Sequence, residues 1–135
     1  VQRDATANVT FLPYQPRELL SRSLSAPDVH LVSLQPQLEG LIVPSKFYGA
    51  LAVGRPVIFI GARDGEVARI IDQHRCGRVV APGDVDGLTA ALRELAEHPD
   101  EARAMGARGL DAYRAHFAPH HAFAAWERVL EEAAS

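Results

Sequence analysis

Short apolar segments, separated by turns that contain proline or glycine, recur along the chain at the spacing of an alternating α/β protein. Four of them have the composition of β-strands, at residues 8–12, 29–34, 57–60 and 78–81. The first combines β-branched and aromatic side chains and ends at Pro13, which is typical of a strand. Residues 57–60 are apolar at every position. This pattern indicates a parallel strand that helices cover on both faces.

The segments between these strands carry helix signals. Residues 17–25 follow Pro16, which suits the start of a helix. A second helix is predicted from Ser45. A third begins at residues 64–66, where acidic side chains favour the positive end of the helix dipole. Its apolar positions recur at i, i+3 and i+4, and Gly77 is placed to cap its C-terminus.

Three more helices are predicted in the last third of the chain. The first follows the turn at residues 82–84. The second begins at Pro99, and its residues Gly106 and Gly109 allow close packing. The last begins after Pro119, and we interpret its aromatic face as a core contact. The inward-facing positions expected for the three helices are Val85, Leu88, Leu92 and Leu95; Ala102, Met105 and Leu110; and Phe123, Trp126 and Leu130.

The predicted order is strand, helix, strand, helix, strand, helix, strand and then three helices, which is typical of a doubly wound parallel α/β sheet. The length of 135 residues corresponds to one domain or part of one, and 47% hydrophobic residues suffice for a core. The chain starts without a methionine, and residues 1–4 resemble the tail of a helix. We therefore expect an upstream part of the protein to be missing.

Charge and cysteine content narrow the classes of partner and compartment. The net charge is −3, so no polyanion-binding surface is expected and nucleic acid is an unsuitable ligand. The single cysteine, Cys76, excludes an internal disulfide and suits a reducing compartment. No apolar run approaches the roughly 18 residues of a membrane span, and the first residues do not have the order of a signal peptide. We expect a cytoplasmic protein.

The loop that follows the predicted strand at 29–34 contains a single acid, Glu39. A carboxylate in this position lies at the carboxyl edge of the sheet, where open α/β sheets bind ligands. It is suited to accept hydrogen bonds from sugar or ribose hydroxyl groups. A solvated loop acid is an equally good interpretation from position alone.

The helix start at Ser45 and Lys46 is the second candidate feature. Ser45 is placed as an N-cap, and Lys46 falls in the first turn. A cation there is unfavourable against the helix dipole by about 0.3–1 kcal/mol unless an anion offsets it. A diphosphate would be such an anion, because backbone N–H groups, the dipole and the ammonium group would converge on it. The alternative is a solvated surface lysine.

Other reactive side chains favour structural roles. Pro119 interrupts any helical face that would join His116, His120 and His121, so no metal site is expected. His30 is better explained as a buried, hydrogen-bonded residue than as a catalytic one. Cys76 has no base near it in sequence and is interpreted as a core residue. No nucleophile elbow or catalytic triad is present.

Two blocks of the sequence resemble the donor-binding motif of retaining glycosyltransferases with the GT-B fold, in the subgroup called family four. The first runs from Glu39-Gly40 through Pro44-Ser45-Lys46-Phe47-Tyr48 to the segment Gly54-Arg55-Pro56-Val57. The second is residues 77–84, and the end of the chain is similar to the final helix of the family, which crosses back toward the N-terminal domain. The resemblance spans nearly the whole chain from Asn8 and implies an incomplete, Rossmann-like C-terminal donor domain.

The resemblance also implies roles for individual residues. Glu39 would contact the transferred sugar and is the candidate catalytic residue. The helix start at Ser45 and Lys46 would face the diphosphate, and Tyr48 belongs to the same motif. The loop that holds Tyr14 and Gln15 falls where the family holds the nucleobase. The backbone amides expected to face the sugar and diphosphate are those of Gly40, Leu41, Ile42 and Val43.

Two departures from the family pattern are visible. The position of the second acid of the family, which binds ribose hydroxyls, is Gly49 in this chain. The two strands and the basic pair that open the domain in the family are also absent. We therefore expect an incomplete domain whose hold on the ribose differs from that of the family.

The resemblance predicts an enzyme that transfers a hexose or acetamido-hexose from a UDP- or GDP-sugar, with retention, to a saccharide or lipid-linked acceptor. Such enzymes act in exopolysaccharide or cell-surface glycan synthesis, without a cofactor, and lipid acceptors bring them to the membrane surface. The acceptor would bind the missing N-terminal domain, so the isolated fragment is expected to be inactive. The alternatives are a nucleotide-sugar epimerase of the same fold and a non-catalytic nucleotide-binding module.

Overall fold

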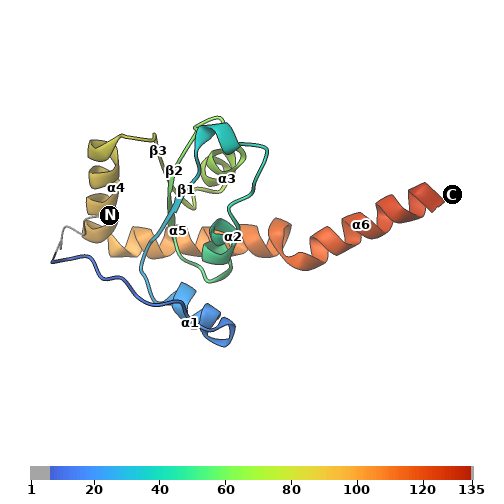
Figure 1. The fold of residues 1–135 in the computed structure, drawn as a ribbon, viewed down its shortest axis with the longest axis horizontal. Coiled ribbons are helices and arrows are strands. Elements are labelled where there is room, and N and C mark those ends of the chain that lie inside the picture. The colour runs from blue at the N-terminus through green and yellow to red at the C-terminus, as the bar shows by residue number, and fades with distance from the viewer. Residues whose placement is uncertain (1–6, 135) are drawn as a thin grey trace.

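The computed structural model describes residues 7–134. Its centre is a three-stranded parallel sheet in the order β1-β2-β3, formed by β1 (His30–Ser33), β2 (Val57–Ile60) and β3 (Gly77–Val80). The first residues of the strands are in register, with His30 opposite Val57 and Val57 opposite Gly77. The fold is therefore α/β with a parallel sheet, as the sequence predicts (Figure 1).

Within residues 7–134, one α-helix precedes β1, two connect the strands and three follow β3. Their bounds are α1 (Leu20–Ser25), α2 (Ser45–Ala52), α3 (Glu66–His74), α4 (Val85–Glu97), α5 (Pro99–Ala112) and α6 (Pro119–Ala134). Short 3-10 turns precede α1 at Arg17–Leu19 and follow β1 at Pro36–Leu38. A π-helical turn at Tyr113–Phe117 joins α5 to α6. Figure 1 shows α6 extending away from the sheet.

Helices cover both faces of the sheet, as expected for a doubly wound arrangement. On one face Val57 and Phe59 pack with Phe47 of α2 and Ile71 of α3. On the other face Ile58 lies in a second cluster, which α4 and α5 complete. The side chains that form this cluster are Ile58, Val80, Ala91, Leu95, Ala102 and Met105. The middle strand is thus buried from both sides, which its uniformly apolar sequence requires.

Close packing of α5 joins the helices to the amino ends of the strands. A Cβ atom added at Gly106 would collide with the carbonyl oxygen of Gly54, which precedes β2. At Gly109 it would lie 2.9 Å from Leu51 and 3.2 Å from the Cβ of Cys76. The prediction that these glycines permit close packing is confirmed.

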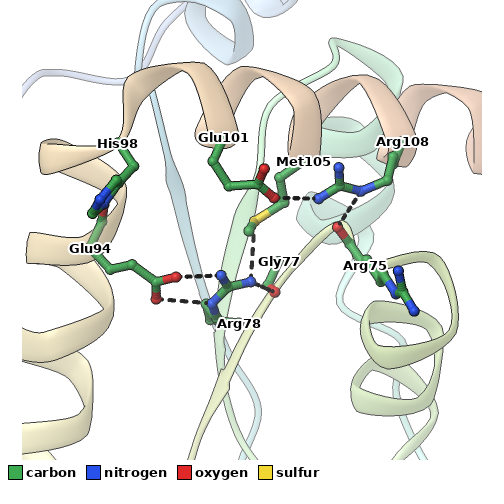
Figure 2. A network of polar contacts seen from close by, with 8 residues as sticks. All are labelled: Arg75, Gly77, Arg78, Glu94, His98, Glu101, Met105 and Arg108. Carbon is green, nitrogen blue, oxygen red and sulfur yellow. Dashed lines mark hydrogen bonds and ion pairs between the residues drawn. The ribbon is translucent and has the colours of Figure 1, made fainter.

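Charged side chains tie α4 to β3 and α5 to the cap of α3, as Figure 2 shows. Arg78 donates two hydrogen bonds to the Glu94 carboxylate, at 3.1 and 2.5 Å, and these bonds lower the pKa of Glu94. Arg108 donates to Glu101 at 2.8 Å and to the carbonyl oxygen of Arg75 at 3.0 Å. Both ion pairs are partly exposed, so each contributes at most about 1 kcal/mol.

Two predictions, one of a strand and one of a helix cap, are wrong. Residues 8–12 have no regular secondary structure, and Phe11 and Leu12 are 76% and 78% exposed. A β-rich composition makes a strand only where a neighbouring strand completes the hydrogen-bond ladder, and in the described part of the chain no strand pairs with this segment. Gly77 is not a helix cap but the first residue of β3. The cap of α3 is Arg75, in the left-handed region at φ 52°.

Two helix faces are also less buried than predicted. In α4, Ala91 and Leu95 are buried, whereas Val85 and Leu92 are 70% and 40% exposed. Phe123, Trp126 and Leu130 do not form a core contact, since each is more than 60% exposed. Within residues 7–134, α6 has no buried residue, because nothing but the preceding π-helical turn packs closely against it.

We predict that Gly106→Ala destabilises the chain by about 1–3 kcal/mol, because the new methyl group meets backbone that cannot rotate away. Urea denaturation measures the change. Ala104→Ser is the control, since residue 104 is exposed on the same helix, and its expected cost is about 0.5 kcal/mol. Equal costs for the two variants would contradict the close approach of α5 to Gly54.

Candidate functional site

A small cavity lies where β1 ends and where α2 and α3 begin. Gly40, at φ 77°, turns the connecting loop back, and the amides of Leu41 and Ile42 donate to the carbonyl oxygen of Leu38. The cavity has a volume of about 120 Å³. Its walls are formed by Leu34, Glu39, Gly40, Leu41, Ile42, Val43, Pro44, Tyr48, Glu66 and Val67. The structure therefore brings most of the predicted loop residues and Tyr48 together.

Glu39 is half-buried, and its carboxyl group lies against the first residues of α3. A Cβ atom added at Gly65, the N-cap of α3, would be 2.5 Å from the Cδ of Glu39. The Oε1 atom is buried, and no hydrogen-bond partner for it is present among residues 7–134. The positive end of a helix favours a carboxylate, but an unpartnered buried oxygen costs free energy. The arrangement is typical of a group held ready for a ligand.

Lys46 stands in the first turn of α2, as predicted, but the cap differs. The N-cap is Pro44, whose carbonyl oxygen accepts from the amide of Phe47, and Ser45 is the first helical residue. Ser45 and Lys46 are both exposed. Within the described part of the chain Lys46 forms no ion pair. Its charge at the positive end of the helix is therefore uncompensated.

Tyr48 forms the boundary between the cavity and an aromatic cluster. Its ring makes edge contacts with Phe47 and Phe117, at centroid distances of 5.2 and 5.4 Å. Burial raises the pKa of the Tyr48 hydroxyl, and the nearby Glu66 carboxylate raises it further. The phenol consequently stays protonated and is a hydrogen-bond donor at neutral pH.

Tyr14 and Gln15 are not brought to this cavity. Tyr14 is 93% exposed, and the side-chain amide of Gln15 donates to the carbonyl oxygen of Pro13 at 3.0 Å. In Figure 1 the blue stretch before α1 runs below the sheet, whereas the cyan loop after β1 lies above it. Their contact with a nucleobase remains a prediction from the resemblance.

The structure adds one acid that sequence reasoning did not assign to the site. Glu66 lines the cavity from the first turn of α3, but its sequence position marks it only as a helix-start acid. Gly49, by contrast, faces α1, because an added Cβ atom would meet Leu24 at 3.2 Å. No local pattern in the sequence indicates which helix starts face the same cavity.

The other reactive residues have structural surroundings. His30 is 5% exposed, and its Nε2 atom lies 2.7 Å from the carbonyl oxygen of Leu24, so the buried, hydrogen-bonded interpretation is confirmed. Cys76 is fully buried in the core, and burial raises the pKa of its thiol to about 11. Among residues 7–134, no group of three or more histidine, cysteine or acidic side chains has the arrangement of a metal site.

A second polar cavity, of about 390 Å³, lies beside β3. Four arginine side chains line it, but Arg78 and Arg108 are already paired with Glu94 and Glu101. The first of these ion pairs joins β3 to α4, and the second lies within α5. Among residues 7–134 the Lys46 ammonium forms no ion pair.

The sequence profile of one known family, described as Glycosyl transferases group 1, matches residues 1–98, which is most of the chain. The chain belongs to this family. A probable glycosyltransferase of Pseudomonas aeruginosa, WbjE, is 32% identical over 94 residues, which are 70% of this chain and 24% of that protein. An MMP alpha-(1->4)-mannosyltransferase of Mycolicibacterium hassiacum is 31% identical over 100 residues, with 68% and 24% covered.

The chain spans about a quarter of the length of these two relatives. No solved structure gives a significant match to it. In the described part of this glycosyltransferase domain, no helix is both long and apolar enough to cross a membrane.

We predict that Glu39→Ala raises the free energy of unfolding by about 1 kcal/mol, because it removes a buried carboxylate oxygen that has no partner. Glu101→Ala is the control: its carboxylate is paired with Arg108, and the variant is expected to be less stable than wild type. Urea denaturation measures both variants. A loss of 1 kcal/mol or more for Glu39→Ala would mean that Glu39 stabilises the fold.

We predict that the stability advantage of wild type over Tyr48→Phe falls as the pH rises above about 10. Unfolded tyrosine loses its proton near pH 10, whereas folded Tyr48, whose pKa is raised, keeps it. The unfolded state then binds fewer protons, so the free energy of unfolding decreases with pH. Urea denaturation of both proteins between pH 8 and 11 tests this. A constant difference over that range would contradict the raised pKa.

Proposed function

We propose that the chain is the donor-binding part of a retaining glycosyltransferase that uses a UDP- or GDP-sugar. The observation that carries the proposal is the presence, on the loop and helix start at one end of the sheet, of two groups that have no partner among residues 7–134. These are the buried Oε1 atom of Glu39, which has no hydrogen bond, and the Lys46 ammonium group, which has no ion pair. Glu39 is suited to bind sugar hydroxyls, and Lys46 with the first amides of α2 is suited to bind a diphosphate.

In the proposed reaction the bond between the anomeric carbon and the diphosphate oxygen breaks, and the acceptor hydroxyl oxygen takes its place. The acceptor proton passes to the departing diphosphate. No protein nucleophile is assigned; this chain contributes placement of the donor and stabilisation of the charge that develops on the leaving group. Lys46 is the side chain that faces this charge, and Glu39 orients the sugar.

Family membership favours glycosyl transfer over the epimerase and the non-catalytic module. The relative from Mycolicibacterium hassiacum is a mannosyltransferase, which supports a hexose donor. We place the acceptor, a saccharide or lipid-linked saccharide, on parts of the enzyme beyond this chain, in the cytoplasm or at the membrane surface. The relatives are about four times as long, so we do not expect the isolated chain to transfer sugar.

We predict that UDP or GDP shifts the backbone amide resonances of residues 39–48, and that Lys46→Met weakens this binding about tenfold or more. The lost interaction is a charge-assisted contact to the diphosphate. Lys46 is the only lysine in the sequence, so reductive methylation with a ¹³C label provides one side-chain NMR signal that reports directly on it.

Arg93→Met is the matched control, because it removes one positive charge from the exposed side of α4. Wild-type affinity is expected for this variant. If neither nucleotide shifts residues 39–48, the proposed donor site is wrong. If Arg93→Met weakens binding as much as Lys46→Met does, the effect is one of overall charge and not of a contact at α2.

A further inference from the structure

Glu66 and Tyr48 line the same cavity as Glu39 but come from different helices, α3 and α2. Glu66 is exposed and Tyr48 is half-buried. Within residues 7–134, neither the Glu66 carboxylate nor the Tyr48 hydroxyl forms a hydrogen bond or an ion pair with another residue. Both groups are therefore available to a ligand in the cavity.

The two groups have complementary hydrogen-bonding roles. A carboxylate only accepts, and it can accept from two hydroxyl groups at once. The Tyr48 phenol is protonated at neutral pH and can donate, and burial and the negative charge of Glu66 raise its pKa further. Its ring is fixed by edge contacts with Phe47 and Phe117, which limits the entropy lost when the hydroxyl binds a ligand.

We propose that Glu66, together with Tyr48, binds vicinal hydroxyl groups of the nucleotide sugar. This inference rests on the proposed function, and it adds a second carboxylate to the site. A ribose and a transferred sugar both present vicinal hydroxyls, and Glu66 accepts hydrogen bonds from either. Gly49 of α2 has no side chain that could bind these hydroxyl groups, and its Cα–Cβ direction leads to Leu24. The proposal therefore assigns the contact with the hydroxyl groups to Glu66 of α3.

A simpler role for Glu66 is to stabilise α3 through the helix dipole, which is typically worth about 0.3–1 kcal/mol. That role acts on stability and is independent of any ligand. Asp86, an exposed acid in the first turn of α4, has the same relation to its own helix and lines none of the cavity. Asp86→Asn is therefore the matched control for Glu66→Gln, because both changes remove a charge from a helix start.

The test is calorimetric titration of wild type, Glu66→Gln and Asp86→Asn with three pairs of probes. The first pair is UDP and GDP, the second is their 2′,3′-dideoxy analogues, and the third is UDP-glucose and GDP-mannose; each pair is one arm of the test. Circular dichroism checks that the variants fold. Glu66→Gln is expected to weaken at least one hydroxyl-bearing probe by about 10-fold to 100-fold. Asp86→Asn is expected to bind every probe as wild type does.

The arms separate the two sources of hydroxyl groups. If Glu66 binds the ribose, Glu66→Gln weakens UDP or GDP and has no effect on the dideoxy analogues. If it binds the transferred sugar, the variant weakens only the nucleotide sugars. A second readout is the pKa of Tyr48 measured by NMR, which is expected to fall in Glu66→Gln because one of its two causes is removed.

Equal affinities of wild type and Glu66→Gln for all probes would overturn the assignment of Glu66 while leaving the donor site intact. Equal losses in Glu66→Gln and Asp86→Asn would also overturn it, since a loss shared by both variants is not a contact in the cavity. Failure of wild type to bind any probe is a different result, because it rejects the proposed function itself.

Discussion

Burial of β2 on both faces is the constraint on which the rest of the structure depends. Val57, Ile58 and Phe59 are fully buried, and burial of each such side chain stabilises the fold by roughly 1.5–3 kcal/mol. Alternate side chains point to opposite faces, so helices must cover both faces of the strand. The connection from β1 to β2 places α2 on one face, and the connection from β2 to β3 places α3 beside it.

The position of the cavity follows from this arrangement. Helices that connect parallel strands run back along the sheet, so they begin at the carboxyl ends of the strands. The starts of α2 and α3 therefore come together beyond β1, and each brings the positive end of a helix dipole. Lys46 and Glu66 stand at these two helix starts, and Glu39 reaches α3 from the loop between β1 and α2.

Charged side chains have different surroundings at the two ends of the sheet. At the amino ends, Arg78 is paired with Glu94 and Arg108 with Glu101, and glycines let α5 lie close to the backbone. At the carboxyl end, Glu39 has a buried oxygen without a partner, and Lys46 is unpaired within the described residues. Local rules of stability are satisfied at one end and broken at the other, which is typical of a stable scaffold that carries a functional site.

The sequence by itself determined the α/β class, three of the four predicted strands, the helix starts and the loop around Glu39, because these depend on local periodicity, capping residues and turns. It also carried the family resemblance. Only the tertiary structure decided that residues 8–12 form no strand, since a strand requires a partner edge. It also decided that the aromatic face of α6 is uncovered and that Gly49 faces α1 while Glu66 enters the cavity. These features depend on which elements meet in space, and hydrophobic periodicity within one segment carries no information about its neighbours.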